Sequence, residues 1–246
     1  MKIIDTHVHL GVSRFSGETS TENEILESME NHGITASLVM SQPTLEDATQ
    51  VHWHIAEMCK KHPRKIFGIA LIDPWLDEEE FRKQFERCIV DYGFVAFKLN
   101  PMDHNISPAS PMCNKIYELA SIHDIPVLVH TGLGTLNALP SLVIDPAKRY
   151  PTVKFILSHA GFAVYTAEAI VAAKCFKNIF LEPSWCPTFM VKSMVQEVGI
   201  DRLMIGSDHI QNIPVELVKW NSIGLLDSQL NQVMFENPNK IFKLNL

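Results

Sequence analysis

Eight short apolar runs, each followed by a segment of helical pattern, constrain the fold of this chain more than any other feature. The runs are residues 2–10, 34–41, 66–73, 94–101, 126–132, 153–161, 178–185 and 203–209. Repeated βα units of this kind form a parallel sheet with right-handed crossovers. Eight units in 246 residues predict an α/β fold, a (β/α)8 TIM barrel, as a single domain over residues 1–246. The tail from Leu225 predicts one or two short helices that close the end of the barrel.

Helix boundaries can be read at several points between these runs. Thr21-x-x-Glu24 and Thr44-x-x-Asp47 have the spacing of helix N-caps, and the acidic segment 77–80 suits the positive end of a helix dipole. Apolar residues at helical spacing predict further helices over 108–123, 139–150, 165–176 and 188–198.

Composition narrows the class of protein. The chain has 28 acids against 21 bases and a net charge of −7, which argues against nucleic acid as a partner and favours a small-molecule substrate. Five scattered cysteines without CxxC spacing indicate reduced thiols and a cytoplasmic protein. No apolar run approaches 18 residues, so neither export nor a membrane span is indicated. A homo-oligomer is left open.

A His-x-His pair lies in the first run. On a strand, Asp5, His7 and His9 project to the same side, so two imidazoles point into one space. A chain of this composition contains such a pair by chance in roughly one of two shuffled sequences, so the spacing alone is a weak signal. His52 and His54 repeat it in a helical stretch, where two residues apart face nearly opposite ways and cannot share a metal.

The position of the polar residues is more informative than their number. Five of the predicted strands end in polar residues that can bind a metal or a substrate. These residues are His7 with His9, Lys98, His130, His159 and Asp208. The carboxyl ends of barrel strands are where catalysis takes place in this fold. Four imidazoles and a carboxylate form a donor set suited to Zn²⁺, with Mn²⁺, Fe²⁺ or Co²⁺ as alternatives.

These motifs carry a resemblance to a known family. IDTHVHLG resembles the first-strand signature of the amidohydrolase superfamily, and FKLNP, VLVHTG, FILSHAG, NIFLEPSW, LMIGSDH and ENPNKIF resemble the serial landmarks of its amidohydrolase-related branch. That branch includes metal-dependent hydrolases and the aminocarboxymuconate-semialdehyde and resorcylate decarboxylases. The resemblance implies that His7, His9 and His130 bind one metal, with Asp208 as a further ligand or as the base. It also implies that His159 polarises the substrate or shuttles a proton.

Two positions qualify the resemblance. Where branch members often show KLHP, this chain has Lys98-Leu99-Asn100-Pro101, which puts any role of that histidine in doubt. In some amidohydrolases a lysine at the end of strand four is carboxylated and bridges two metals. We expect Lys98 to stay a free ammonium that binds an anionic substrate, with one metal; a carboxylated Lys98 would imply a second ion.

Further residues are expected around the pocket. Arg14 and Trp185 are candidate substrate walls. Glu182 and Ser184 could line the pocket, although Glu182 could equally be paired structurally. His209 should face away from Asp208 on a strand and serve a structural role.

The leading functional hypothesis is metal-dependent hydrolysis of a small, anionic ester, lactone or amide. The metal would lower the pKa of a bound water and Asp208 would take its proton. The alternative is metal-dependent, non-oxidative decarboxylation on the same scaffold. A TatD-type nuclease is less favoured, because that group resembles a chain with glutamate where this one has Lys98. A barrel kept as a scaffold would be expected to have lost ligands, and all are present.

Overall fold

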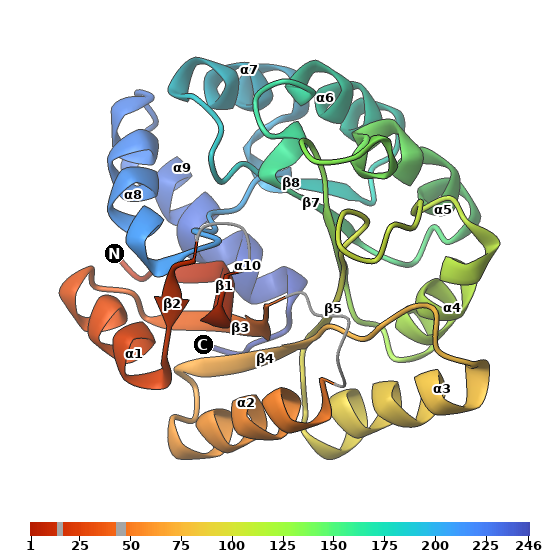
Figure 1. Ribbon diagram of the computed structural model, residues 1–246. Coiled ribbons are helices and arrows are strands. Elements are labelled where there is room, and N and C mark those ends of the chain that lie inside the picture. The colour runs from red at the N-terminus through yellow and green to blue at the C-terminus, as the bar shows by residue number, and fades with distance from the viewer. Residues whose placement is uncertain (14–16, 43–47) are drawn as a thin grey trace.

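In the computed structural model, which describes residues 1–13, 17–42 and 48–246, a curled sheet forms the centre of the protein (Figure 1). Its eight strands within the described residues run in the order β2-β1-β3-β4-β5-β6-β7-β8. The strands are β1 Ile4–Val12, β2 Thr19–Ser20, β3 Ala36–Ser41, β4 Ile66–Ala70, β5 Ala96–Leu99, β6 Val127–His130, β7 Phe155–Ser158 and β8 Ile179–Glu182. Neighbours pair in parallel except β1 and β2, which are antiparallel. Seven of the eight predicted runs are therefore strands.

Helices cover the outer face of the sheet, and the last of them packs at one end of its interior (Figure 1). They are α1 Glu22–Asn31, α2 Thr49–Lys61, α3 Glu78–Glu86, α4 Asn114–Ile122, α5 Ile144–Arg149, α6 Thr166–Cys175, α7 Thr188–Val198, α8 Ile213–Ser222, α9 Asp227–Asn231 and α10 Asn237–Ile241. Wider helical turns extend α3 over Arg87–Asp91 and join α9 to α10 over Gln232–Glu236. In the described part of the chain, no helix has both the length and the apolar character needed to cross a membrane.

The helix starts agree with the sequence where they can be compared. Thr21 caps α1 in the predicted capping box, accepting from the amide of Glu24 at 3.3 Å. The predicted start at Thr44-x-x-Asp47 lies outside the described residues, and α2 begins at Thr49. The helices expected over 108–123 and 139–150 begin later than predicted, because tighter 3-10 turns precede α4 and α5.

The predicted eighth strand, 203–209, is not a regular strand. It joins its neighbours through two isolated parallel bridges, Leu181 with Leu203 and Val8 with Asp208. Residues 204–207 between these bridges form no regular ladder, and the segment ends at Asp208 in a left-handed conformation, with φ of 69°. The amide of Ser207 also turns to the carboxylate of Asp5, at 2.9 Å, instead of to a strand partner. The fold is a TIM-barrel-like curled sheet in which this segment lies between β8 and β1.

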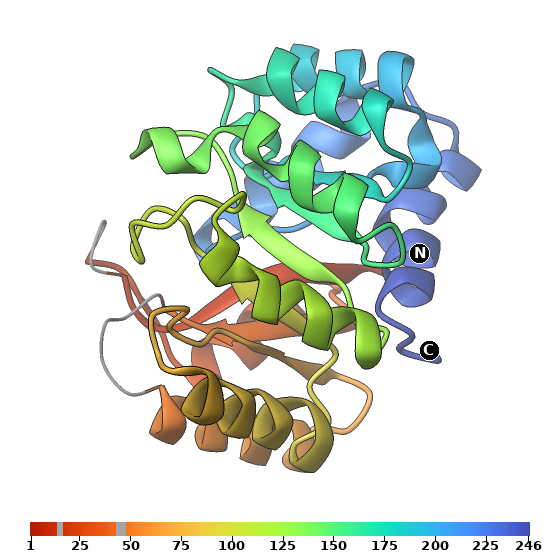
Figure 2. The same ribbon diagram turned by 90° about the vertical axis from the view of Figure 1, so that its right-hand side faces the viewer.

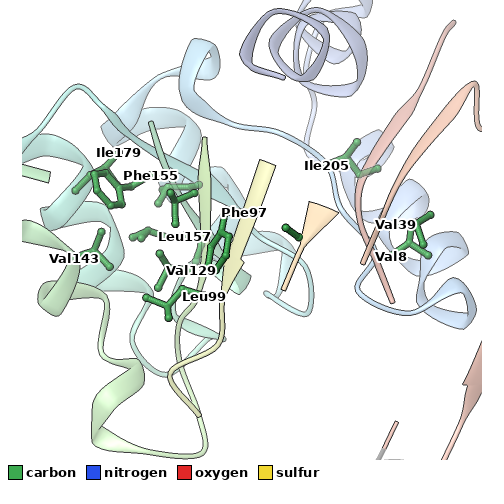
Figure 3. Close-up of a cluster of buried hydrophobic side chains, with 14 of the residues drawn as sticks. Val8, Val39, Phe97, Leu99, Val129, Val143, Phe155, Leu157, Ile179 and Ile205 are labelled. Atoms are coloured by element: carbon green, nitrogen blue, oxygen red, sulfur yellow. The ribbon is translucent and has the colours of Figure 1, made fainter. Parts of the chain in front are cut away.

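Side-chain alternation separates two apolar clusters. One lies between the sheet and the helices and contains Phe97, Val129 and Leu157 (Figure 3). The other lies inside the curl of the sheet and contains Leu128 and Ile156. Because neighbours on a strand face opposite ways, this register turns the polar side chains at alternate positions of β5, β6 and β7 inward.

The C-terminal tail covers one end of this interior. Ile241, Phe242 and Leu244 pack in the inner cluster against Ile4 and Leu38, which lie early in β1 and β3. Figure 2 shows both termini and the blue C-terminal helices at this same end. The tail therefore closes one end of the curled sheet, as the sequence predicted, and the structure shows that this is the N-terminal end of the strands. The opposite end is left for a site.

Candidate active site

His7, His9 and Asp208 meet at the carboxyl end of β1. The Nε2 atoms of the two histidines lie 3.2 Å apart. Asp208 Oδ1 lies 3.3 Å from Nε2 of His7 and 3.4 Å from Nε2 of His9. The described residues form two groups whose ligand atoms are close enough to share one metal ion, His7 with His9 and Asp208, and His7 with His159 and Glu182. The strand places both rings on one side, and the bridge from Val8 to Asp208 brings the carboxylate beside them.

The other nitrogen of each ring is already engaged. His9 Nδ1 donates to the carbonyl of Ser41 at 2.7 Å, and His7 Nδ1 donates to Glu182 Oε2 at 2.9 Å. Burial lowers the pKa of His9 to about 4 and, with the charge of Lys98, holds the pKa of His7 well below its ordinary value. Both rings are therefore neutral, with their Nε2 lone pairs turned toward each other. Two facing lone pairs beside a carboxylate fit a divalent cation, and the carbonyl and carboxylate behind the rings are partners typical of metal-binding histidines.

Lys98 approaches the same point from β5. Its side chain is buried, and Nζ lies 3.0 Å from His7 Nε2 and donates to Ser158 Oγ at 2.9 Å. Burial lowers the pKa of Lys98 to about 8, although the charges of Asp208 and Glu182 oppose the shift. The ammonium form still dominates at neutral pH. The Lys98 side chain therefore adds positive charge to the site.

His159 and His130 lie beside each other, with ring centroids 4.8 Å apart. His159 Nδ1 contacts Ser184 Oγ at 2.7 Å, and burial with the neighbouring histidines lowers the pKa of His159 well below its usual value. His130 Nε2 donates to the carbonyl of Leu133 at 3.4 Å. His130 belongs to neither ligand group formed by the described residues, so its role as a metal ligand stays a prediction.

A layer of buried groups holds these residues from behind. Glu182 is buried against His7, so of the two expectations for it the structural pairing holds. Burial raises the pKa of Glu182 to about 7, opposed by donors that include the amide of Ser184 at 2.6 Å. Asp5 accepts from the amide and the hydroxyl of Ser207 at 2.9 and 2.6 Å. The expected alternation along β1 fails at this point: the strand has a register shift between Asp5 and Val8, so Ile4 packs in the inner cluster and Val8 in the outer one. The sequence also could not assign Ser207 to Asp5, because the two residues are 202 positions apart.

Asp208 is held on both sides. Oδ1 faces the two histidines, and Oδ2 accepts from the indole nitrogen of Trp185 at 2.8 Å. Burial alone would raise the pKa of Asp208, but His7, His9, His209 and Lys98 together hold it below the ordinary range. The expectation for His209 was wrong. Its Nε2 lies 3.7 Å from Asp208 Oδ2 and its side chain lines the cavity, because the left-handed backbone at Asp208 breaks the strand alternation.

A cavity of about 360 Å³ opens onto this cluster. It is lined by His9, Ser13, Glu18, Gln42, Lys98, Asn100, Met102, Asp103, His130, Leu133, Gly134, His159, Phe162, Trp185, Asp208 and His209. Trp185 stands in its wall as expected and stacks on Phe162 with ring centroids 6.4 Å apart. Arg14, the other expected wall residue, lies outside the described residues. Asn100, where the motif departs from its usual form, accepts from the amides of the turn that follows.

Comparison with known proteins adds to this geometry. The family model described as Amidohydrolase matches residues 4–244. The gamma-resorcylate decarboxylase of Polaromonas sp. (strain JS666) is 21% identical to this chain over an alignment of 285 residues. The alignment covers 88% of this chain and 86% of that protein.

Solved structures resemble this one over nearly their full length. A putative amidohydrolase from Staphylococcus aureus has a TM-score of 0.80 at 19% identity and covers 99% of this chain and 100% of its own. The 2,6-dihydroxybenzoate decarboxylase from Rhizobium has a TM-score of 0.81 at 16% identity and covers 100% of both chains. The dihydroxybenzoic acid decarboxylase from Polaromonas sp. JS666, solved with manganese and 2-nitroresorcinol, has a TM-score of 0.79 at 17% identity and covers 100% of this chain and 98% of its own. At these identities the likeness shows a shared fold.

Proposed function

Because the chain belongs to the amidohydrolase family, whose model matches residues 4–244, we propose that it is a metal-dependent, non-oxidative decarboxylase of a small aromatic or conjugated carboxylic acid. The relatives named above that carry an assigned activity are decarboxylases, and this supports the alternative reading of the sequence over hydrolysis. The cavity volume of about 360 Å³ suits a substrate of this size.

The observation that carries the proposal is the state of Asp208. Hydrolysis with Asp208 as base requires a carboxylate oxygen that can take a proton from an activated water. Here Oδ1 faces His7 and His9, and Oδ2 accepts from Trp185. These contacts favour Asp208 as a ligand over Asp208 as a base.

The donor set supports a divalent transition metal. His7, His9 and Asp208 would hold it, with His130 as the further ligand that the family resemblance implies. When bound, the ion would supply positive charge that stabilises the negative charge developing on the substrate. Imidazole and carboxylate donors suit both Zn²⁺ and Mn²⁺, and manganese is the ion in the Polaromonas neighbour.

The remaining polar residues would handle charge and protons. The Lys98 ammonium neutralises an anionic substrate at the floor of the cavity. His159, fixed at Nδ1 by Ser184, presents its other nitrogen for proton delivery. As the bond to the carboxyl carbon breaks, its electron pair takes that proton and forms the new C–H bond, and CO₂ leaves. An anionic substrate beside His159 would favour the protonated ring and offset its lowered pKa.

The apolar wall completes this arrangement. Leu133, Phe162 and Trp185 line the cavity together with the polar cluster. An apolar surface of this kind binds a flat ring and displaces water from the reacting carbon. It therefore suits a proton transfer to carbon better than the attack of a water molecule.

The test is a comparison of two product classes. Protein loaded with Mn²⁺ or Zn²⁺ is incubated with hydroxylated benzoates and unsaturated acids, and CO₂ is measured by a coupled assay. The same protein is incubated with esters, lactones and amides, and released acid is measured. We expect CO₂ from at least one acid, and His159→Asn should lower kcat by about 10²–10⁴-fold with metal retained.

Acid release without CO₂ would restore hydrolysis as the main function. In that case Asp208→Asn should also lower kcat by about 10²–10⁴-fold while the variant keeps its metal. An Asp208→Asn variant that loses metal instead would identify Asp208 as a ligand.

The domain organisation and the location of the protein in the cell are part of the same proposal. Residues 1–246 form one domain, in which 203–208 takes the place of the eighth strand of a (β/α)8 barrel. The protein acts in the cytoplasm on a small molecule. Limited proteolysis that yielded two stable fragments with separate unfolding transitions would contradict the single domain.

A further inference from the structure

A group of buried polar residues on α8 has no place in the reaction described above. Glu216 and Lys219 lie in the helix and Asn212 immediately precedes it, with exposed fractions of 1%, 6% and 4%. Of the described residues that line the cavity, none comes from this group. Burying a charged pair costs free energy unless the surroundings compensate it, so a role should be sought in what the three residues hold.

The group binds two loops at once. Glu216 Oε1 accepts from the backbone amide of Trp185 at 3.0 Å and from Asn212 Nδ2 at 3.1 Å. Lys219 Nζ pairs with Glu216 Oε2 at 2.5 Å and donates to the carbonyl of Pro183 at 2.8 Å. Asn212 Nδ2 also donates to the carbonyl of Ser207 at 3.0 Å. One loop follows β8, and the other precedes Asp208.

Each of these loops carries a residue in a left-handed backbone conformation. Trp185 has a φ of 65° and Asp208 a φ of 69°. Non-glycine residues keep such conformations only where their surroundings over-determine them. The same two residues meet in the cavity, where the Trp185 indole donates to Asp208 Oδ2.

We propose that Asn212, Glu216 and Lys219 form a positioning device that sets Trp185 and, through its indole N–H, turns Asp208 so that Oδ1 faces His7 and His9. The inference rests on the proposed metal site. Its consequence is that a residue with no cavity contact, Glu216, governs how well the donor set binds a metal.

Two matched double variants separate positioning from general stability. Glu216→Gln with Lys219→Met removes both charges and keeps an acceptor oxygen for the Trp185 amide. Glu216→Leu with Lys219→Met removes the same charges and the acceptor. The difference between the two variants therefore reports the hydrogen bond from Glu216 to the Trp185 amide and not the loss of a buried charge.

Two readouts need no substrate. Mn²⁺ affinity is measured by titration calorimetry on the metal-free protein. The indole N–H resonance of Trp185, assigned by its disappearance in Trp185→Phe, reports the hydrogen bond to Asp208. Loss of a group that orients a metal ligand typically costs 10–100-fold in affinity, so we expect about that loss in the Leu variant, with an upfield indole proton. The Gln variant should stay within about threefold of the native protein.

Trp185→Phe keeps the aromatic ring and removes the indole N–H, so it should weaken Mn²⁺ binding by the same 10–100-fold. In the Trp185→Phe background the Leu variant should then add no further loss, because the effect passes through the indole. Additive losses, a Trp185→Phe variant with native affinity, or equal affinities of the Gln and Leu variants would each overturn the proposal. If the Leu variant does not fold, native Mn²⁺ affinity in Trp185→Phe still overturns the proposal.

The failure of the metal site can be told apart from the failure of the positioning device. A native protein that binds no Mn²⁺ would overturn the metal site and, with it, the proposed function. In that event the indole resonance still tests the positioning: an unshifted Trp185 indole proton in the Leu variant would overturn the device as well.

Discussion

Gly206, in the segment 203–209 between β8 and β1, allows His7 and Glu182 to approach the backbone closely. Gly206→Ala should therefore lower both stability and metal affinity. A Cβ at this position would lie 2.7 Å from Glu182 Cδ and 2.9 Å from His7 Cβ, which real contacts do not reach. Both neighbours are buried, so they can yield only by moving the hydrogen bond between them. Overpacking of this kind costs about 1–3 kcal/mol, or about 2–12 °C in Tm for a chain of this size. If Glu182 is displaced from His7 Nδ1, metal affinity should fall by about 10–100-fold.

The assay combines thermal unfolding of the metal-free protein with Mn²⁺ titration. Gly33→Ala is the matched control, because φ there is 67° and the added Cβ meets nothing within 4 Å. Its cost is backbone strain of about 1–2 kcal/mol, far from the site, so Tm should fall and metal affinity should stay native. Native affinity in Gly206→Ala would refute the reasoning, as would an equal loss in both variants.

Three further outcomes are expected. His7→Ala combined with His9→Ala should abolish bound metal by elemental analysis, whereas His54→Ala on α2 should leave it unchanged; full metal content in the double variant would remove the site. Lys98→Met should raise KM for an anionic substrate by about 10–100-fold with one metal retained, while two metals with bicarbonate-dependent activity of the native protein would establish a carboxylated lysine. Burial raises the pKa of Asp5 from 3.8 to about 7, so the folded metal-free protein loses stability as pH rises from about 4 through 7. The slope from this group is at most about 1.4 kcal/mol per pH unit, and Asp5→Asn should lack it in denaturant titrations; equal slopes would contradict the burial argument.

The sequence alone determined where the polar side chains lie along the strands. Lys98 and His130 each follow a run of apolar residues, so both were expected at the carboxyl end of a strand. The strand period of two paired His7 with His9, and the helical period separated His52 from His54. The structure agrees, because His52 is buried and His54 is exposed on α2. Local rules succeed here because each depends on neighbours a few residues apart.

Only the tertiary structure decided how these side chains engage one another. The hydrogen bonds from His7 to Glu182 and from Trp185 to Asp208 join residues 175 and 23 positions apart, which no local period relates. The left-handed backbone at Asp208, which is followed by His209 in the cavity, occurs where this segment bridges Val8 of β1, 200 residues earlier in the chain. A side chain's direction follows from its own strand, but its partner, tautomer and pKa depend on groups that meet only when the sheet curls, because burial and hydrogen bonding act through space and not along the chain.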